Sequence, residues 1–321
     1  MSAAKPLATE ASRRASPRGA GFETGFEYLC FAAATTLLAM LGGLLVSLLL
    51  GGWPALAKFG LGFFTNATWD PVAGVFGVSA LIVDTIVVAL LALLMAIPIA
   101  FGVAFFLVEL CPSALRRPIG TAVELLAGVP SIVYGMWGLF VFGPVFAKLV
   151  ERPLMNAAPP GSIWEKLTAG VPNGTGILSA SIIVAMMVLP FIAATLRDLL
   201  TTVPAQVRES AYGLGATTGE VVMTVTLPYV RRGAIGAVML GLGRALGETM
   251  AVTFIIGNAH NFPKSLFDSG ATIASTIANE FAEATTPLHT AALLAAGLIL
   301  FLISFAVLAL ARMMLGRQTR L

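Results

Sequence analysis

Long apolar runs constrain this chain more than any other feature, because about 20 consecutive apolar residues are enough to cross a bilayer as a helix. Hydrophobic residues make up 58% of the 321 positions and charged residues only 11%, whereas about a quarter of a soluble domain is charged. The runs expected to form spanning helices are Tyr28–Gly51, Val75–Val108, Ile119–Lys148, Ile177–Leu196, Ala234–Gly257 and His289–Met314. The chain is therefore predicted to be an all-α integral membrane protein with six transmembrane helices.

The polar N-terminal segment, residues 1–27, shows neither helical nor strand periodicity, so we expect a disordered tail before a six-span domain over residues 28–321. The apolar run that follows is too long for a cleaved signal peptide, and no A-x-A-like site ends it. Thirteen of the 19 Lys and Arg residues fall in the tails and loops on the side that holds both termini. This excess predicts that both termini lie in the cytoplasm, and it explains the net charge of +3 without nucleic acid.

Cysteine and histidine are scarce, which limits the chemistry that the chain can perform. Cys30 and Cys111 fall at predicted cytoplasmic ends of spans, where a disulfide is not expected. His260 and His289 are the only histidines, and there is no C-x-x-C pair. We therefore expect no structural metal, and we also predict no cofactor and no catalytic residue.

Two predicted spans carry small residues at four-residue spacing, which lets membrane helices approach each other closely. They are Ala92, Ala96, Ala100 and Ala104 in the second span, and Gly233, Ala237, Gly241 and Ala245 in the fifth. The pattern predicts a tightly packed helix bundle.

Between the fourth and fifth spans lies a polar insert, residues 201–228, longer than a hairpin loop requires. It is predicted to form two short helices: Thr202 caps the first, and Gly213 or Gly215 ends it. The sequence Thr217-Thr-Gly-Glu220 has the form of a capping box for the second helix, and Pro228 is expected to close it.

The polarity of this insert suggests that it binds another protein. The alternative is an amphipathic hairpin resting on the membrane surface, but the polar face of such a helix should be rich in Lys and Arg. Here Arg208 is balanced by Glu209 and Glu220. Docking on a partner is therefore the favoured interpretation.

A charged pair lies inside the predicted fifth span. Arg244 is expected about 15 Å deep, and Glu248 follows four residues later, on the same helical face. A buried Arg costs roughly 2.5–3.5 kcal/mol in a membrane helix, so the charge needs a reason. It either joins helices together, with Asp84 and Glu124 as further members, or it holds an oxyanion through its planar fork of N–H donors.

In the second interpretation Glu248 holds the guanidinium group in place. Glycines beside the arginine then leave room for a solute to pass, namely Gly241, Gly243 and Gly247. The physics of this pair indicates a small oxyanion and no particular one.

The insert resembles the EAA loop of the membrane subunits of ABC importers. The matching residues are Glu209, Ala211, Gly215, Leu227 and Pro228, and the departures are Ser210 for the usual Ala and Val225 for the usual Ile. The resemblance implies a type I ABC importer permease of the MetI-like fold, with its core at about 75–315 and its coupling helices between spans four and five. It also implies that the insert, 201–228, docks on an ATPase subunit. The chain contains no G-x-x-x-x-G-K-[ST] motif, so ATP hydrolysis is expected of another polypeptide, and this chain is not an enzyme.

Two further motifs resemble the phosphate-uptake branch of these permeases, the PstC type. They are Gly241-Leu-Gly-Arg-Ala-Leu-Gly-Glu-Thr-Met250 with Ile255-Ile-Gly-Asn258, and Gly128-Val-Pro-Ser-Ile-Val-Tyr-Gly-Met-Trp-Gly-Leu-Phe140. The resemblance implies a multi-pass protein of the bacterial cytoplasmic (inner) membrane with Arg244 and Glu248 on the substrate path. The implied partners are a second permease of the PstA type, a cytoplasmic ATPase dimer of the PstB type, an extracytoplasmic phosphate-binding protein of the PstS type and membrane lipid, with no nucleic acid.

Other functions remain open at this point. A permease for molybdate, sulfate or phosphonate would use the same charge. An ion-coupled secondary transporter could use Asp84, Glu124 and Glu248, although such folds usually show internal repeats, and no clear repeat is present. A sensor or scaffold could use the insert to bind a signalling protein.

Overall fold

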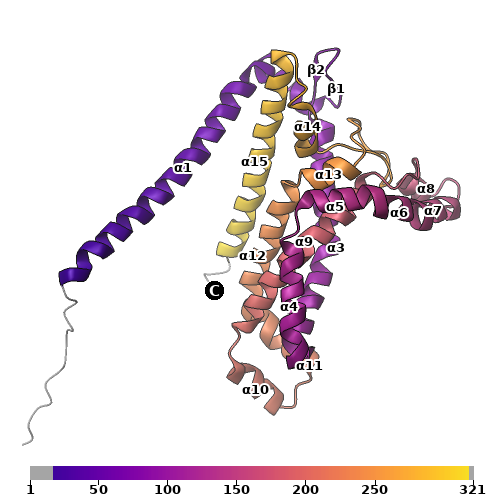
Figure 1. Cartoon of the computed structure of the whole chain (residues 1–321). Helices are drawn as coiled ribbons and strands as arrows, with labels where there is room; N and C mark the ends of the chain where they lie inside the picture. The colour runs from indigo at the N-terminus through magenta and orange to yellow at the C-terminus, as the bar shows by residue number, and fades with distance from the viewer. Residues whose placement is uncertain (1–16, 318–321) are drawn as a thin grey trace, which may run out of the picture. The chain divides into compact units, whose positions relative to one another are not determined.

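A computed structural model of the chain describes residues 17–317, which are almost entirely helical (Figure 1). The chain divides into two compact units, residues 1–50 and residues 51–321. Helix α1 (Pro17–Phe59) supplies the described part of the first unit. It begins at Pro17, so residues 17–27 are helical rather than part of the predicted tail; residues 1–16 lie outside the described residues. Proline is well suited to the first helical position, where its missing N–H has no intrahelical partner to lose.

The second unit contains the remaining elements and one two-stranded antiparallel ladder, in which Trp69 lies opposite Phe76 and Asp70 opposite Val75. Its strands are β1 (Trp69–Asp70) and β2 (Val75–Phe76). Its α-helices are α2 (Gly62–Thr65), α3 (Ser79–Phe105), α4 (Ser113–Ala127), α5 (Ser131–Trp137), α6 (Gly143–Phe146), α7 (Arg152–Ala157), α8 (Ile163–Thr168), α9 (Ile177–Thr201), α10 (Ala205–Gly213), α11 (Thr218–Val221), α12 (Leu227–Leu246), α13 (Met250–Ile255), α14 (Ile273–Glu280) and α15 (Pro287–Arg317). Its π-helical segments are η1 (Phe106–Leu110), η2 (Gly138–Phe142), η3 (Ala147–Glu151) and η4 (Val222–Thr226).

Within residues 17–317, five helical stretches are long and apolar enough to cross a membrane. They are Gly25–Phe59, Ser79–Leu110, Ser131–Ala157, Ile177–Thr201 and Pro287–Leu310. Four of them contain most of the first, second, fourth and sixth predicted spans. The other two predicted spans are interrupted.

The third predicted span, Ile119–Lys148, is divided because α4 ends at Ala127 and α5 begins at Ser131. Between them Val129 precedes Pro130, and a residue before proline is disfavoured in the α conformation. The stretch from α5 to α7 runs at a steep angle to α9 in Figure 1. The membrane-length stretch therefore starts after the break, at Ser131.

The fifth predicted span, Ala234–Gly257, is also broken. Helix α12 ends at Leu246, and α13 begins only at Met250. Glycine is the poorest helix former after proline, so Gly247 is a favourable position for the break. Neither α12 nor α13 is among the five long apolar stretches.

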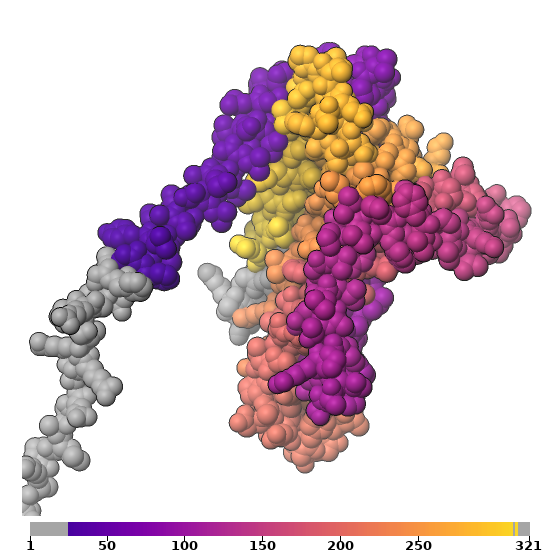
Figure 2. All heavy atoms as spheres, viewed as in Figure 1, coloured from indigo at the N-terminus to yellow at the C-terminus, as the bar shows by residue number. Residues whose placement is uncertain are grey.

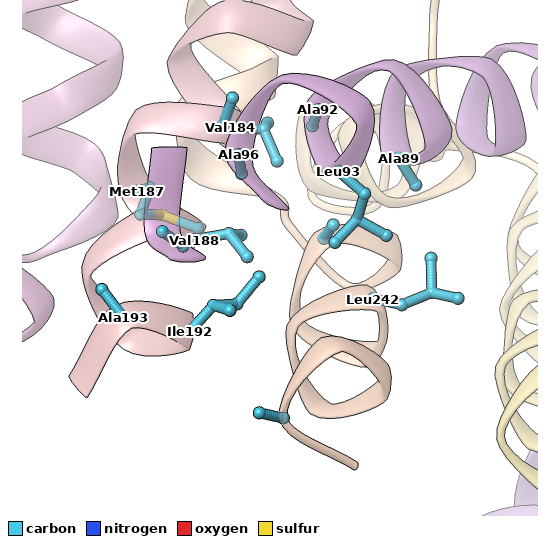
Figure 3. Close-up of a cluster of buried hydrophobic side chains, with 14 of the residues drawn as sticks. Ala89, Ala92, Leu93, Ala96, Val184, Met187, Val188, Ile192, Ala193 and Leu242 are labelled. Atoms are coloured by element: carbon cyan, nitrogen blue, oxygen red, sulfur yellow. The ribbon is translucent and has the colours of Figure 1, made fainter. Parts of the chain in front are cut away.

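The main core forms where α3, α9 and α12 pack together (Figure 3). The predicted alanine row of α3 lies in this core, and its members Ala92, Ala96, Ala100 and Ala104 are all fully buried. Figure 3 shows Ala92 and Ala96 beside Val184 of α9. Because lipid tails are as apolar as these side chains, close van der Waals contact rather than burial from water holds such helices together.

A second core lies at the end of this unit that carries the β1–β2 hairpin and α14 (Figure 1). Trp69 and Phe76 are buried there in an edge-to-face contact with ring centroids 5.0 Å apart. A β-carbon on Gly52 would lie 2.8 Å from the backbone of Ala295, so α1 and α15 approach closely at this point. Helices α10 and α11 lie at the opposite end of the unit (Figure 1).

Candidate functional site

The insert begins with α10, and its start differs from the prediction. The Thr202 hydroxyl donates to the carbonyl of Leu199 at 2.6 Å, so Thr202 closes α9 and does not cap α10. Pro204 directly precedes α10 instead. After α10 the chain turns at Gly215, whose φ of +88° is a conformation that side chains with a β-carbon rarely adopt.

The predicted capping box is present at the start of α11. The Thr217 backbone N–H and hydroxyl both donate to Glu220 at 2.7 and 2.8 Å, and the Glu220 N–H donates back to the Thr217 hydroxyl. These bonds stabilise the carboxylate, and they lower the pKa of Glu220 below its ordinary value.

Pro228 does not close the second helix. Segments α11, η4 and α12 follow one another without a gap, and Pro228 lies in the first turn of α12. Proline removes one backbone donor and collides with the carbonyl four residues earlier in a regular α-helix. The residue four positions before Pro228 lies in η4, which ends directly before α12. The π-helical turn there is wider than an α-helical turn, and the helix continues past the proline.

The insert presents apolar side chains to its surroundings, and it forms one end of the second unit (Figure 2). Leu214 is 90% exposed and Met223 is 68% exposed, and α10 buries no residue. Of the motif residues, Glu209, Gly215 and Pro228 are exposed, and Ala211 and Leu227 are half-buried. The described residues of the chain therefore leave these apolar side chains uncovered.

Arg244 and Glu248 are not paired. Within residues 17–317 no ion pair joins them, because α12 ends at Leu246 and the expected one-turn spacing is lost. Arg244 is exposed, whereas Glu248 is buried and accepts a hydrogen bond from the Ala251 N–H at 3.2 Å. Glu248 therefore holds the start of α13 and does not hold the guanidinium group.

An aromatic side chain that the sequence analysis did not single out lies near Arg244. Its guanidinium carbon is 5.9 Å from the centre of the Phe191 ring of α9. Helix α9 thus contributes to the surroundings of this exposed cation on α12.

Some glycines of the two motifs lie at close contacts between helices. A β-carbon on Gly135 would lie 2.9 Å from Ala251, so α5 and α13 are in close contact there. A β-carbon on Gly241 would lie 2.6 Å from Ile192 of α9. Gly241 therefore does not leave room for a solute, contrary to the prediction. Gly247 has more space, since the nearest atom to its β-carbon would be 3.6 Å away.

The other charged residues considered as partners of Arg244 bind elsewhere. Asp84 is fully buried in α3, and its Oδ2 accepts the Ala271 N–H at 2.8 Å. Glu124 of α4 pairs with Arg197 of α9 at 2.6 Å. The arrangement does not support a polar network that joins Arg244, Asp84 and Glu124.

Both histidines meet at the end opposite to the insert, although they are far apart in sequence. The Glu280 carboxylate lies 2.8 Å from His289 Nε2 and 3.3 Å from His260 Nε2, and it accepts a bond from the Trp69 indole N–H at 2.8 Å. Burial lowers the pKa of His260, and the charge of Glu280 opposes this shift. Among the residues that the structure describes, no group of three or more His, Cys, Asp and Glu side chains is arranged to hold a metal ion.

Comparison with known proteins gives one family. Residues 71–320 match the family described as "Binding-protein-dependent transport system inner membrane component". The chain is similar to the phosphate transport system permease protein PstC of Mesorhizobium japonicum, at 53% identity over 89% of this chain and 88% of that protein. It is also similar to PstC of Pasteurella multocida, at 49% identity over 87% of each chain.

The fold is similar to that of a solved structure of the MetNI methionine ABC transporter in an inward-facing conformation. The TM-score is 0.54 at 16% identity, over 75% of this chain and 97% of that chain. This likeness supports the MetI-like fold that the sequence predicted.

Proposed function

This chain belongs to the family of binding-protein-dependent transport system inner membrane components, and we propose that it is the membrane permease subunit of an ATP-driven importer of inorganic phosphate. The observation that carries the proposal is the similarity to PstC permeases, at 47–53% identity over about nine-tenths of the chain. The chain itself makes and breaks no covalent bond. ATP hydrolysis is the task of a separate subunit.

The insert is the proposed docking site for that ATPase subunit. Its second helix is capped, its turn depends on Gly215, and Leu214 at the turn is almost fully exposed. An exposed leucine at the end of a short ordered helix can enter a cleft of a partner protein, where it would be removed from water. Glu209 and Ala211 lie on α10, and Leu227 and Pro228 lie where the insert joins α12.

In the membrane we propose six crossings, with residues 113–157 forming the third and the broken pair α12–α13 forming the fifth. The positive-inside rule then places both termini and the insert in the cytoplasm. A broken helix near the membrane midplane is a common construction at transport sites, because it places backbone and side-chain polar groups beside a solute.

Arg244 is the proposed contact for phosphate. It is exposed at the end of α12 and has no carboxylate partner among the described residues. Its donors are therefore free to bind an oxyanion in two places at once. In the phosphate path, Glu248 holds the start of α13 in place. It thereby also fixes the conformation of the break between α12 and α13, which follows Arg244.

Complete transport requires further subunits. A second permease of the PstA type would complete the path, two ATPase subunits of the PstB type would bind the inserts, and a binding protein of the PstS type would deliver phosphate. Closure of the ATPase pair would move the inserts together and open the path outward, and its release would turn the path inward.

Uptake of radiolabelled phosphate by cells tests this function. Uptake that needs the chain should disappear when the ATPase partner is deleted, and excess unlabelled phosphate should compete better than sulfate or molybdate. Uptake that continued without the ATPase would contradict the proposal and favour ion-coupled transport. Better competition by sulfate or molybdate would change the substrate and leave the importer class intact.

A further inference from the structure

A hydrogen-bonded ion pair joins the insert directly to a membrane-length helix. Arg208 Nη1 of α10 lies 3.0 Å from Glu109 Oε1 of η1, the π-helical end of the stretch that begins with α3. The Glu109 side chain is only 9% exposed and that of Arg208 is 24% exposed. Ion pairs in full contact with water contribute little, but a partly buried pair with good geometry holds its two elements in one arrangement.

The two elements joined by this pair differ in how firmly they are held. Helix α10 buries none of its residues, so it has little apolar packing to fix its position. In η1, by contrast, Leu107 and Val108 are buried. The Arg116 guanidinium closes the end of η1 by donating to the carbonyls of Val108 and Cys111, at 2.8 and 3.4 Å.

Beyond η1 the contacts continue into the main core. Ala104 of α3 is fully buried, and α3 packs along α9. A displacement of α10 therefore has a continuous path through Arg208, Glu109 and η1 to α3, without passing through exposed loop. Coupling between distant sites needs such a physically connected set of contacts.

We propose that the Arg208–Glu109 ion pair is a positioning link that transmits movement of α10 to α3 during transport. A hydrogen-bonded ion pair has a preferred distance and direction, so it opposes displacement of α10 both towards η1 and away from it. The inference rests on the proposed docking of the insert on an ATPase.

The test measures phosphate uptake and ATP hydrolysis together in proteoliposomes that contain the complete importer. The variants are Arg208→Glu, Glu109→Arg and the double exchange, with Arg117→Glu as a matched loss of one cytoplasmic arginine that is exposed and lies on α4. Each single exchange should lower the phosphate transported per ATP by about tenfold, within the roughly 5–150-fold range of coupling between sites. The double exchange should restore most of the ratio, and Arg117→Glu should leave it unchanged.

If both single variants transport as much phosphate per ATP as the wild type, the proposed link is wrong. It is also wrong if the double variant assembles but transports no more phosphate per ATP than the single variants. If a single variant does not assemble, the link is tested instead with a Glu109→Cys/Arg208→Cys protein that also carries Cys30→Ser and Cys111→Ser. A short thiol crosslinker should raise its ratio of phosphate to ATP, and a ratio that is normal before crosslinking would contradict the proposal.

Failure of the link can be separated from failure of the docking itself. A Leu214→Cys variant in the same cysteine background tests whether the insert contacts the ATPase, by crosslinking to cysteines placed along the cleft of that subunit. Absence of any crosslink would refute the docking. A crosslink together with unchanged ratios in the Arg208 and Glu109 variants would refute only the link.

Discussion

The two ends of the second unit are held together in different ways. At the end with the β1–β2 hairpin, aromatic rings pack around Trp69, and the Glu280 carboxylate contacts Trp69, His260 and His289 from separate segments. At the insert end, α10 buries no residue, and a single ion pair joins it to η1. Local stability differs between parts of a protein, because segments with few buried contacts open and move at a lower free-energy cost.

The difference between the two ends distinguishes residues that matter for stability from residues that matter for coupling, although both kinds look alike in the sequence. A charged residue at the hairpin end, such as Asp84 or Glu280, serves backbone and ring N–H groups and is expected to matter for stability. A charged or glycine residue in the insert, such as Arg208 or Gly215, is expected to matter for coupling. Substitutions at the two ends should therefore affect different measurements.

The largest effect is expected at the turn of the insert. Gly215→Val places a β-branched side chain at a φ of +88°, which such residues avoid, so the turn should be deformed and phosphate uptake per ATP should be lost. The melting temperature of the purified protein should change little, because this end contributes few buried contacts. The matched control is Gly213→Ala, since Gly213 also has open space around it but does not have a positive φ. Normal uptake per ATP in Gly215→Val would remove the reason for assigning coupling to the insert.

A substitution at the opposite end should show the reverse behaviour. Asp84→Leu leaves the buried N–H of Ala271 without an acceptor, which costs about 1–3 kcal/mol of folding free energy. Thermal unfolding in detergent should show a lower melting temperature. Asp84→Asn keeps an acceptor oxygen in the same place and should unfold close to the wild type. Equal melting temperatures for the Leu variant and the wild type would show that this contact does not fix the hairpin end.

The smallest effect concerns the two histidines. Burial lowers the pKa of His260 below its ordinary value of 6.5, so the folded protein prefers the neutral ring. The resulting stability is present above pH 6.5 and is lost as the pH falls towards the lower pKa of the folded state. The melting temperature should therefore fall slightly from about pH 8 to about pH 5, and less in a His260→Gln variant. An identical pH dependence in both proteins would mean that His260 does not contribute.

Local signals predicted local structure well. The capping box at Thr217 and Glu220 forms as expected, because all of its bonds lie within four residues. The alanine row of α3 is buried as its four-residue spacing indicated. The predicted role of Thr202 as the cap of α10 was wrong for an equally local reason. Its hydroxyl can hydrogen-bond to the helix before it or to the helix after it, and it donates to the Leu199 carbonyl of the helix before.

Averages over long windows did not locate the helix breaks. The runs that contain Val129–Pro130 and Gly247 are apolar on average, yet a helix is interrupted at each. The Arg244–Glu248 pair was an incorrect prediction for this reason, because a four-residue spacing places two side chains together only while the helix continues. Phe191 approaches Arg244 through tertiary packing, for which the sequence carries no local signal.

The most direct test of this account is phosphate uptake by cells that carry the wild-type protein, Arg244→Lys or Arg244→Gln, with the amount of each protein in the membrane measured by immunoblot. Arg244→Gln should abolish uptake at normal membrane levels of the protein. Arg244→Lys should keep part of it, because lysine retains the charge but lacks the planar fork. Full uptake in Arg244→Gln would contradict a charge-dependent phosphate path along α12.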